Sequence, residues 1–188
     1  MFNSVRAGLA LAAFIAVPVF AASDMPGVGN FHKVNDAVYR GAQPTDEGFR
    51  NLAQLGVKTV IDLRGSEHSM ADEQRAVEAN GMRYVSIPMK GMHTPTAEEI
   101  SAVLKVMNDP SSGPVFVHCK RGADRTGAVI ACYRIGHDKW ENGKALDEAS
   151  SLGMSWYQLQ IRSYVKGYGA PSAPAPAAGI AASVISTK

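Results

Sequence analysis

A cysteine and an arginine six positions apart flank a predicted strand-to-helix junction. Cys119 follows the apolar run 114–118, and Arg125 lies near the start of the next predicted helix, with Gly122 between them. At such a junction the unpaired N–H groups of the loop and of the first helical turn, together with the helix dipole, attract an anion. The same field stabilises a thiolate, so we expect the pKa of Cys119 to lie well below the free value of ~8.5. The segment therefore predicts a nucleophilic thiolate beside a site for a tetrahedral oxyanion.

Strands and helices alternate along the chain that must position this segment. Apolar β-branched or alternating stretches predict strands at 37–40, 57–63, 82–88 and 114–118. Helical periodicity and end signals predict helices at 45–56, 70–80, 96–107, 126–135, 141–151 and 156–166. We therefore predict an α/β fold with a mainly parallel central sheet of four to five strands flanked by helices. Ligands bind beyond the carboxyl ends of such strands, where the segment after 114–118 lies.

Local signals mark the ends of two of these helices. Thr45 is an N-cap residue, and Gly56 is a C-terminal stop for the helix at 45–56. Thr96 and Glu99 have the spacing of a capping box, and the apolar positions that follow repeat with helical spacing.

The two ends of the chain differ in composition from the part between them. Arg6 is followed by sixteen uncharged residues, 7–22, which are too few for a spanning helix and are interrupted by Pro18. This pattern predicts a signal peptide at 1–21, with Ala22 as the alternative end and an uncleaved membrane anchor as the alternative interpretation. Residues 170–188 are rich in Ala, Pro and Ser, which is typical of a disordered tail. One domain, residues 22–169, remains.

The charge balance argues against a nucleic-acid partner. The chain has 19 Lys and Arg against 17 Asp and Glu, and loss of Arg6 with the leader leaves a formal net charge of +1. A non-specific nucleic-acid binder shows a basic excess or clustered basic residues, which this chain lacks. We also expect no metal, because the histidines have no ligand spacing: they are His32, His68, His93, His118 and His137.

The two cysteines are not expected to form a disulfide. Cys132 lies about two turns along the helix that follows Cys119, and a bridge needs Cα atoms within ~7 Å. Cys119 therefore stays a free thiol, even though the predicted leader places it in an oxidising compartment.

The string HCKRGADRTG resembles the signature of the cysteine-dependent protein tyrosine and dual-specificity phosphatases, which is His-Cys, five residues, Arg, then Thr or Ser and Gly. YRGAQP and VIDLRG, earlier in the chain, look like segments of the small bacterial, plant and fungal dual-specificity phosphatases. The looser resemblance runs from about 38 to 163 and implies a phosphotyrosine-phosphatase-like fold.

The resemblance also implies a role for each residue of the loop. Cys119 would attack phosphorus and form a phosphocysteine, and Arg125 would hold two phosphoryl oxygens through its planar fork. Thr126 would hydrogen-bond the thiolate as it leaves, and His118 would support the loop. The substrate phosphate would be bound by Lys120, Arg121, Gly122, Ala123 and Arg125.

The general acid departs from the family pattern. Most members carry this Asp on a separate loop, yet residues 89–96 contain no carboxylate. Asp124 is the leading candidate, since myotubularin-like lipid phosphatases have an Asp at that place in the loop. His93 is a competitor, and Asp62 a weaker one. Asp124 could instead fix the loop by pairing with Lys120 or Arg121.

These observations predict an exported phosphatase, periplasmic or secreted, that hydrolyses phosphate monoesters without a cofactor and is not held in a membrane once the leader is cleaved. Lys120 and Arg121 add charge that favours a polyanion, so the expected substrates are phosphotyrosine-type proteins, phosphoinositides or inositol phosphates. Two alternatives stay open, a pseudo-phosphatase that binds phosphate ligands without turnover and a sulfur transferase of the rhodanese type. The sequence does not predict the oligomeric state.

Overall fold

The computed structural model describes residues 25–65, 70–91 and 93–169. A five-stranded sheet with the order β1-β2-β5-β3-β4 forms its centre. The strands are β1 (His32–Lys33), β2 (Val38–Ala42), β3 (Thr59–Asp62), β4 (Arg83–Ser86) and β5 (Val115–Cys119). All neighbouring strands are parallel except the edge pair of β1 and β2. The predicted fold class is therefore confirmed.

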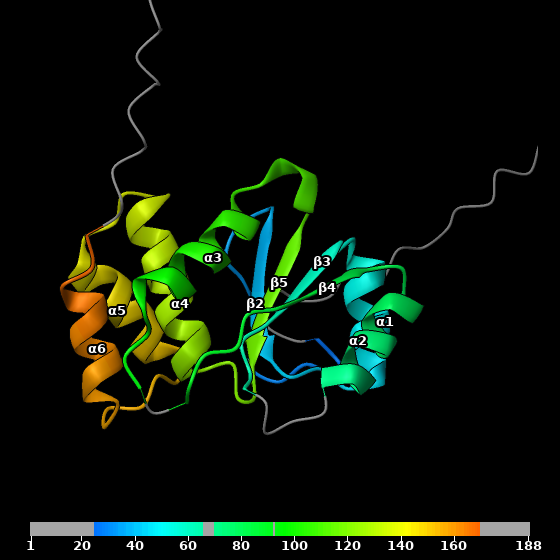
Figure 1. The fold of residues 1–188 in the computed structure, drawn as a ribbon, viewed down its shortest axis with the longest axis horizontal. Coiled ribbons are helices and arrows are strands. Elements are labelled where there is room, and N and C mark those ends of the chain that lie inside the picture. The colour runs from blue at the N-terminus through cyan, green and yellow to red at the C-terminus, as the bar shows by residue number, and fades with distance from the viewer. Residues whose placement is uncertain (1–24, 66–69, 92, 170–188) are drawn as a thin grey trace, which may run out of the picture.

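Within the described residues, six α-helices cover the two faces of the sheet. They are α1 (Asp46–Leu55), α2 (Met70–Ala79), α3 (Ala97–Met107), α4 (Asp124–Gly136), α5 (Asn142–Ser151) and α6 (Leu159–Lys166), and a short 3-10 helix occupies Pro110–Ser112. Figure 1 shows α1 and α2 on one side of the sheet and α3 to α6 on the other. The helices therefore change from one face of the sheet to the other once along the chain, between α2 and α3 (Figure 1).

The central strand β5 is buried along its whole length and carries side chains into both layers. Val117 and Cys119 pack in the core formed with α3 and α4. Phe116 packs against α1 and α2, and His118 stacks on it with ring centroids 5.7 Å apart. Because neighbouring residues of a strand point to opposite faces, Cys119 and His118 project to opposite sides of the sheet.

The structure confirms two predicted helix starts, adds one strand and corrects the starts of two other helices. Thr45 caps α1, and Thr96 forms the capping box of α3. The strand β1 was missed, because two edge residues leave no periodic signal. Helix α4 begins at Asp124 rather than at 126, since no side chain caps it, and α6 begins at Leu159 rather than at 156.

The predicted signal peptide, 1–21, and the predicted C-terminal tail, 170–188, lie outside the described residues, as do residues 22–24 of the predicted domain. Within the described ranges no helix has the length and apolar content that crossing a bilayer requires.

Candidate active site

The loop of residues 120–123 joins β5 to α4 at the carboxyl edge of the parallel strands, as the sequence predicts. We call it the β5–α4 loop. The residue before α4 is Ala123, which has no side chain able to cap the helix. The N–H groups of the first helical turn are therefore left for another acceptor, and the helix dipole favours an anion there.

Gly122 allows this loop to pack directly against the end of β2. Its φ is +67°, in the left-handed region, and a Cβ at this position would lie 2.3 Å from the carbonyl carbon of Gly41. The neighbouring Lys120 carbonyl accepts a hydrogen bond from the Gln43 N–H at 3.4 Å. Only glycine fits both the backbone angle and the close approach.

The thiol of Cys119 is almost completely buried, with 3% of its surface exposed. Burial by itself raises the pKa of Cys119, but the Thr126 hydroxyl and N–H, the Arg125 charge and the Arg121 N–H outweigh it, so the pKa lies below its ordinary value. The Thr126 hydroxyl is buried and has no competing hydrogen-bond partner among the described residues, so it is available to the Cys119 sulfur. A lowered pKa means that the thiolate persists to lower pH than in a free cysteine.

The second cysteine has the opposite electrostatic setting. Cys132 is buried in α4 among apolar side chains, and burial raises its pKa to about 12. Both cysteines are free thiols, as expected from their spacing. One protein therefore contains a thiol poised to ionise and a thiol held neutral, which makes Cys132 a matched control for Cys119.

The guanidinium of Arg125 is held at the site by two backbone carbonyl groups, each from a residue that follows another strand. Its Nη1 donates to the carbonyl oxygen of Leu63, after β3, at 3.3 Å and to that of Met89, after β4, at 3.2 Å. These contacts use one nitrogen and fix the plane of the guanidinium, so the other N–H groups stay available for phosphoryl oxygens.

Asp124 lies in the first turn of α4 and is tied to the segment between α5 and α6. Its Oδ1 accepts the N–H of Ser155 at 2.7 Å, and its Oδ2 pairs with Nη2 of Arg121. Arg121 also reaches the Ser155 hydroxyl at 3.3 Å. Both carboxylate oxygens have donors, an arrangement that favours the structural alternative for Asp124 over the role of general acid.

The remaining candidates for the general acid lie in different surroundings. His93 is exposed in the segment after β4, and its N–H approaches the Lys90 carbonyl at 3.4 Å. Asp62 is fully buried on the α2 side of the sheet and bound by Arg64. Although burial opposes it, the Arg64 contacts hold the pKa of Asp62 below its ordinary value, so this carboxylate has no proton to give near neutral pH.

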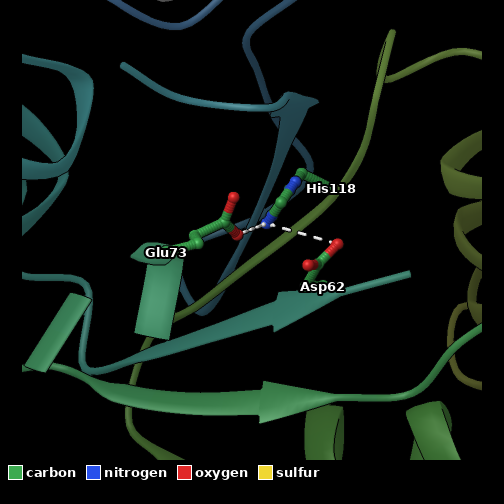
Figure 2. Close-up of side chains that lie close together, drawn as sticks. All are labelled: Asp62, Glu73 and His118. Carbon is green, nitrogen blue, oxygen red and sulfur yellow. Dashed lines mark ion pairs between the residues drawn. The ribbon is translucent and has the colours of Figure 1, made fainter. Parts of the chain in front are cut away.

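His118 contacts helix α2 and not the thiol. Figure 2 shows its ring between Glu73 and Asp62, with Nε2 at 2.8 Å from Glu73 Oε1 and at 3.9 Å from Asp62 Oδ1. Arg64 pairs with both carboxylates, through Nη2, at 2.7 Å and 2.5 Å. His118 therefore supports the site through the end of β5, by locking that strand to α2 from the far face.

This buried cluster has the residue types of a metal site, which the sequence spacing did not indicate. One ligand atom each from Asp62, Glu73 and His118 lie within 4.8 Å of one another. The guanidinium of Arg64, however, already supplies the positive charge between the two carboxylates. The cluster thus works as an ion-pair network, and its residues do not fit a resident cation without displacing that arginine.

Sequence reasoning missed two residues that bind the backbone of the β5–α4 loop. The Gly122 carbonyl accepts hydrogen bonds from Arg40 Nη2 at 2.5 Å and from Asn30 Nδ2 at 3.0 Å. Arg40 left one signal, a charged residue inside a short apolar strand. Asn30 left none, because its partner is 92 positions away.

Comparisons with known proteins agree with this geometry. The family model described as "DSP-PTPase phosphatase fused to NAD+ Kinase" matches residues 9–167. The chain is 32% identical over 137 residues to the dual specificity protein phosphatase TpbA of Pseudomonas aeruginosa (strain UCBPP-PA14), covering 72% of this chain and 60% of TpbA. It is 29% identical over 137 residues to the inositol diphosphatase DSP3 of Arabidopsis thaliana, covering 70% of this chain and 66% of DSP3.

A solved structure extends the agreement to three dimensions. The crystal structure of P. aeruginosa TpbA in complex with pTyr matches with a TM-score of 0.63 at 27% identity, covering 73% of this chain and 83% of that one. The chain spans 60–66% of the length of the two curated relatives. The family model covers the sheet, the β5–α4 loop and every loop residue considered above, and the chain therefore belongs to the DSP-PTPase phosphatase family.

Proposed function

We propose that this protein hydrolyses phosphate monoesters through a phosphocysteine formed on Cys119. The observation that carries the proposal is the setting of that thiol. The thiol is buried and its pKa is lowered. It directly precedes the β5–α4 loop, which leads into the uncapped first turn of α4, where Arg125 lies. A nucleophile and an anion site thus occupy the same few residues.

The reaction consists of two displacements at phosphorus. In the first, the Cys119 sulfur forms a bond to phosphorus while the bond to the leaving oxygen breaks, and that oxygen keeps the electron pair. In the second, a water oxygen forms a bond to phosphorus while the bond from phosphorus to sulfur breaks. The water's proton passes to solvent, and the sulfur leaves as a thiolate stabilised by the Thr126 hydroxyl. Arg125 and the loop N–H groups hold the phosphoryl oxygens as charge spreads over them.

The surroundings of the loop favour substrates whose leaving group needs little help from an acid. Residues 89–96 contain no carboxylate, and both oxygens of Asp124 are engaged. A phenolate or a phosphate group leaves far more readily than the alkoxide of a sugar. Aryl phosphate monoesters of the phosphotyrosine type meet this condition. Diphosphates meet it too, since the same displacement at phosphorus then breaks a phosphoanhydride bond. Both agree with the names of the relatives, a protein phosphatase bound to pTyr and an inositol diphosphatase.

Exposed charge at the loop supports a polyanionic substrate. Lys120 is exposed beside the anion site, and the side chain of Arg121 is 57% exposed while it pairs with Asp124. We further propose export of the protein, supported by the apolar run 7–22 after Arg6. Hydrolysis then takes place outside the cytoplasm.

Phosphate release from three matched substrates tests the proposed function. We expect steady turnover of p-nitrophenyl phosphate and of an inositol diphosphate, and much slower turnover of an alkyl phosphate. Binding of these compounds without release of phosphate would instead establish the pseudo-phosphatase alternative. Transfer of sulfur from thiosulfate would establish the rhodanese alternative.

Replacement of Asp124 by asparagine tests its role as a loop tether. Asparagine keeps an acceptor for the Ser155 N–H and loses the ion pair with the half-exposed Arg121, so we expect a loss of no more than about fivefold in kcat, equal for aryl and alkyl phosphates. Asp138→Asn, which breaks a comparable pair with Arg134 away from the loop, is the control. A loss of ~10²–10⁴-fold confined to alkyl phosphates would show that Asp124 is the general acid.

A further inference from the structure

A fully buried arginine lies next to the β5–α4 loop on the neighbouring strand. Arg40 pairs in register with Val117, two residues before the pair of Ala42 and Cys119. Residues two apart on a strand point to the same face, so the side chain of Arg40 enters the layer that also contains the Cys119 thiol. Its Nη2 donates to the Gly122 carbonyl at 2.5 Å.

The charge of Arg40 has no carboxylate of its own. No ion pair joins it to any described residue, and its Nε and Nη1 have no hydrogen-bond partner there. The charged or titratable groups around it are Glu148 of α5, Arg134 of α4, His32 of β1 and Cys119. Glu148 is already bound by Arg134, at 2.8 Å and 3.1 Å. Burial lowers the pKa of Arg40 to about 10, which still leaves it protonated at neutral pH.

The hydrogen bond to the loop does not by itself explain this buried charge. The Gly122 carbonyl also accepts a hydrogen bond from the Asn30 amide at 3.0 Å, and Asn30 bridges on to the Leu152 carbonyl at 3.0 Å. The carbonyl would therefore stay satisfied without Arg40. Burial of an unpaired charge disfavours folding. Among the neighbouring anions, Glu148 offsets that cost most, although it is shared with Arg134, and the Cys119 thiolate comes next. An oxyanion bound in the loop would add to them.

We propose that Arg40 is a positioning residue that keeps the Gly122 carbonyl pointing away from the anion site and supplies positive charge to Cys119 from the neighbouring strand β2. Because the hydrogen bond keeps the carbonyl on the side of the loop that faces Arg40, the other side of the loop presents N–H groups. Its charge acts on the thiolate and on bound phosphate alike. This inference rests on the proposed function only in that both concern the same site, because its consequences can be measured without turnover.

Two variants separate the charge of Arg40 from its hydrogen bond. Arg40→Gln keeps donor groups and loses the charge, whereas Arg40→Lys keeps the charge and loses the planar fork. The readout is the rate at which iodoacetamide modifies Cys119 as a function of pH, followed on the Cys119 peptide, with and without inorganic phosphate. Thermal unfolding reports whether each variant folds.

We expect Arg40→Gln to raise the pKa of Cys119 by about one unit, so that alkylation below that pKa slows about tenfold. Protection by phosphate should need about tenfold more phosphate. Arg40→Lys should stay within about threefold of the wild type in both measurements, and the unfolding temperature of Arg40→Gln should not fall. Arg75→Gln removes the same charge from an exposed position on α2 and should change neither measurement.

The outcomes distinguish this inference from the proposed function. If alkylation of Arg40→Gln follows the wild-type pH profile, or if Arg40→Lys is as slow as Arg40→Gln, Arg40 has no electrostatic role and the inference fails. If the wild type is alkylated rapidly and protected by phosphate but releases none from any substrate, the proposed function fails, and the Arg40 comparison still holds. Should Arg40→Gln not fold, Arg40→Lys decides: a profile unlike that of the wild type overturns the role of charge.

Discussion

Cys119→Ser is expected to lower kcat for p-nitrophenyl phosphate by about 10⁴–10⁶-fold, the range seen when an enzyme loses its nucleophile. A serine hydroxyl does not ionise near neutral pH, and the field that lowers the pKa of the Cys119 thiol cannot bring an alcohol into range. Phosphate binding should survive within about tenfold, because the loop N–H groups and Arg125 are intact and the negative thiolate is gone. The measurement is steady-state release of phosphate, with phosphate affinity by calorimetry.

The second cysteine supplies the control for this result. Cys132→Ala removes a thiol that is buried in α4 and whose pKa is raised to about 12. It should leave kcat within about twofold while lowering stability by ~1 kcal/mol through the small cavity it creates. Retained turnover in Cys119→Ser, or equal loss in both variants, would remove Cys119 from the reaction.

Arg125→Lys is expected to lower kcat/KM by about 10²–10³-fold, the effect of losing one preorganised donor to a developing charge. Lysine keeps the charge, but its single nitrogen cannot hold two phosphoryl oxygens in one plane while it also donates to the Leu63 and Met89 carbonyls. The comparison is made with Arg162→Lys, whose arginine binds the Ser150 hydroxyl away from the loop. An Arg125→Lys protein within about tenfold of the wild type, ~1.4 kcal/mol, would show that point charge alone suffices.

Much of the fold follows from local patterns in the sequence. The apolar strands, the Thr45 cap and the Thr96 capping box each depend on neighbours within one or two turns, and the structure has them where the sequence places them. The start of α4 was placed two residues late, since Ala123 carries no capping side chain and an anion site replaces the cap. A helix start without a capping side chain leaves no local signal in the sequence, so its position could not be predicted.

The supports of the site depend on contacts between distant parts of the chain. Cys119, Arg125 and Thr126 could be recognised because they occur within eight residues of sequence. Asn30 and Arg40, in contrast, meet Gly122 across separations of 92 and 82 positions. Such pairs have no periodic signature, and only the folded sheet brings them together.

The face on which His118 lies shows the same limit. The resemblance assigns His118 a supporting role for the loop without saying from which side, and strand alternation turns its side chain to the face opposite Cys119. Glu73, its actual partner, comes from the next layer. Residues that follow one another in a strand are neighbours in sequence but lie on opposite faces of the sheet.

Rapid acid quenching during turnover of p-nitrophenyl phosphate, followed by mass spectrometry of the Cys119 peptide, tests the phosphocysteine most directly. With this good leaving group, we expect phosphorylation of the thiolate to be faster than hydrolysis of the phosphocysteine. We therefore predict one phosphoryl group on Cys119 that appears with a burst of nitrophenolate and disappears once the substrate is exhausted. Steady turnover with no phosphoryl group on Cys119 at any quench time, or with the phosphoryl group on another side chain, would contradict the mechanism.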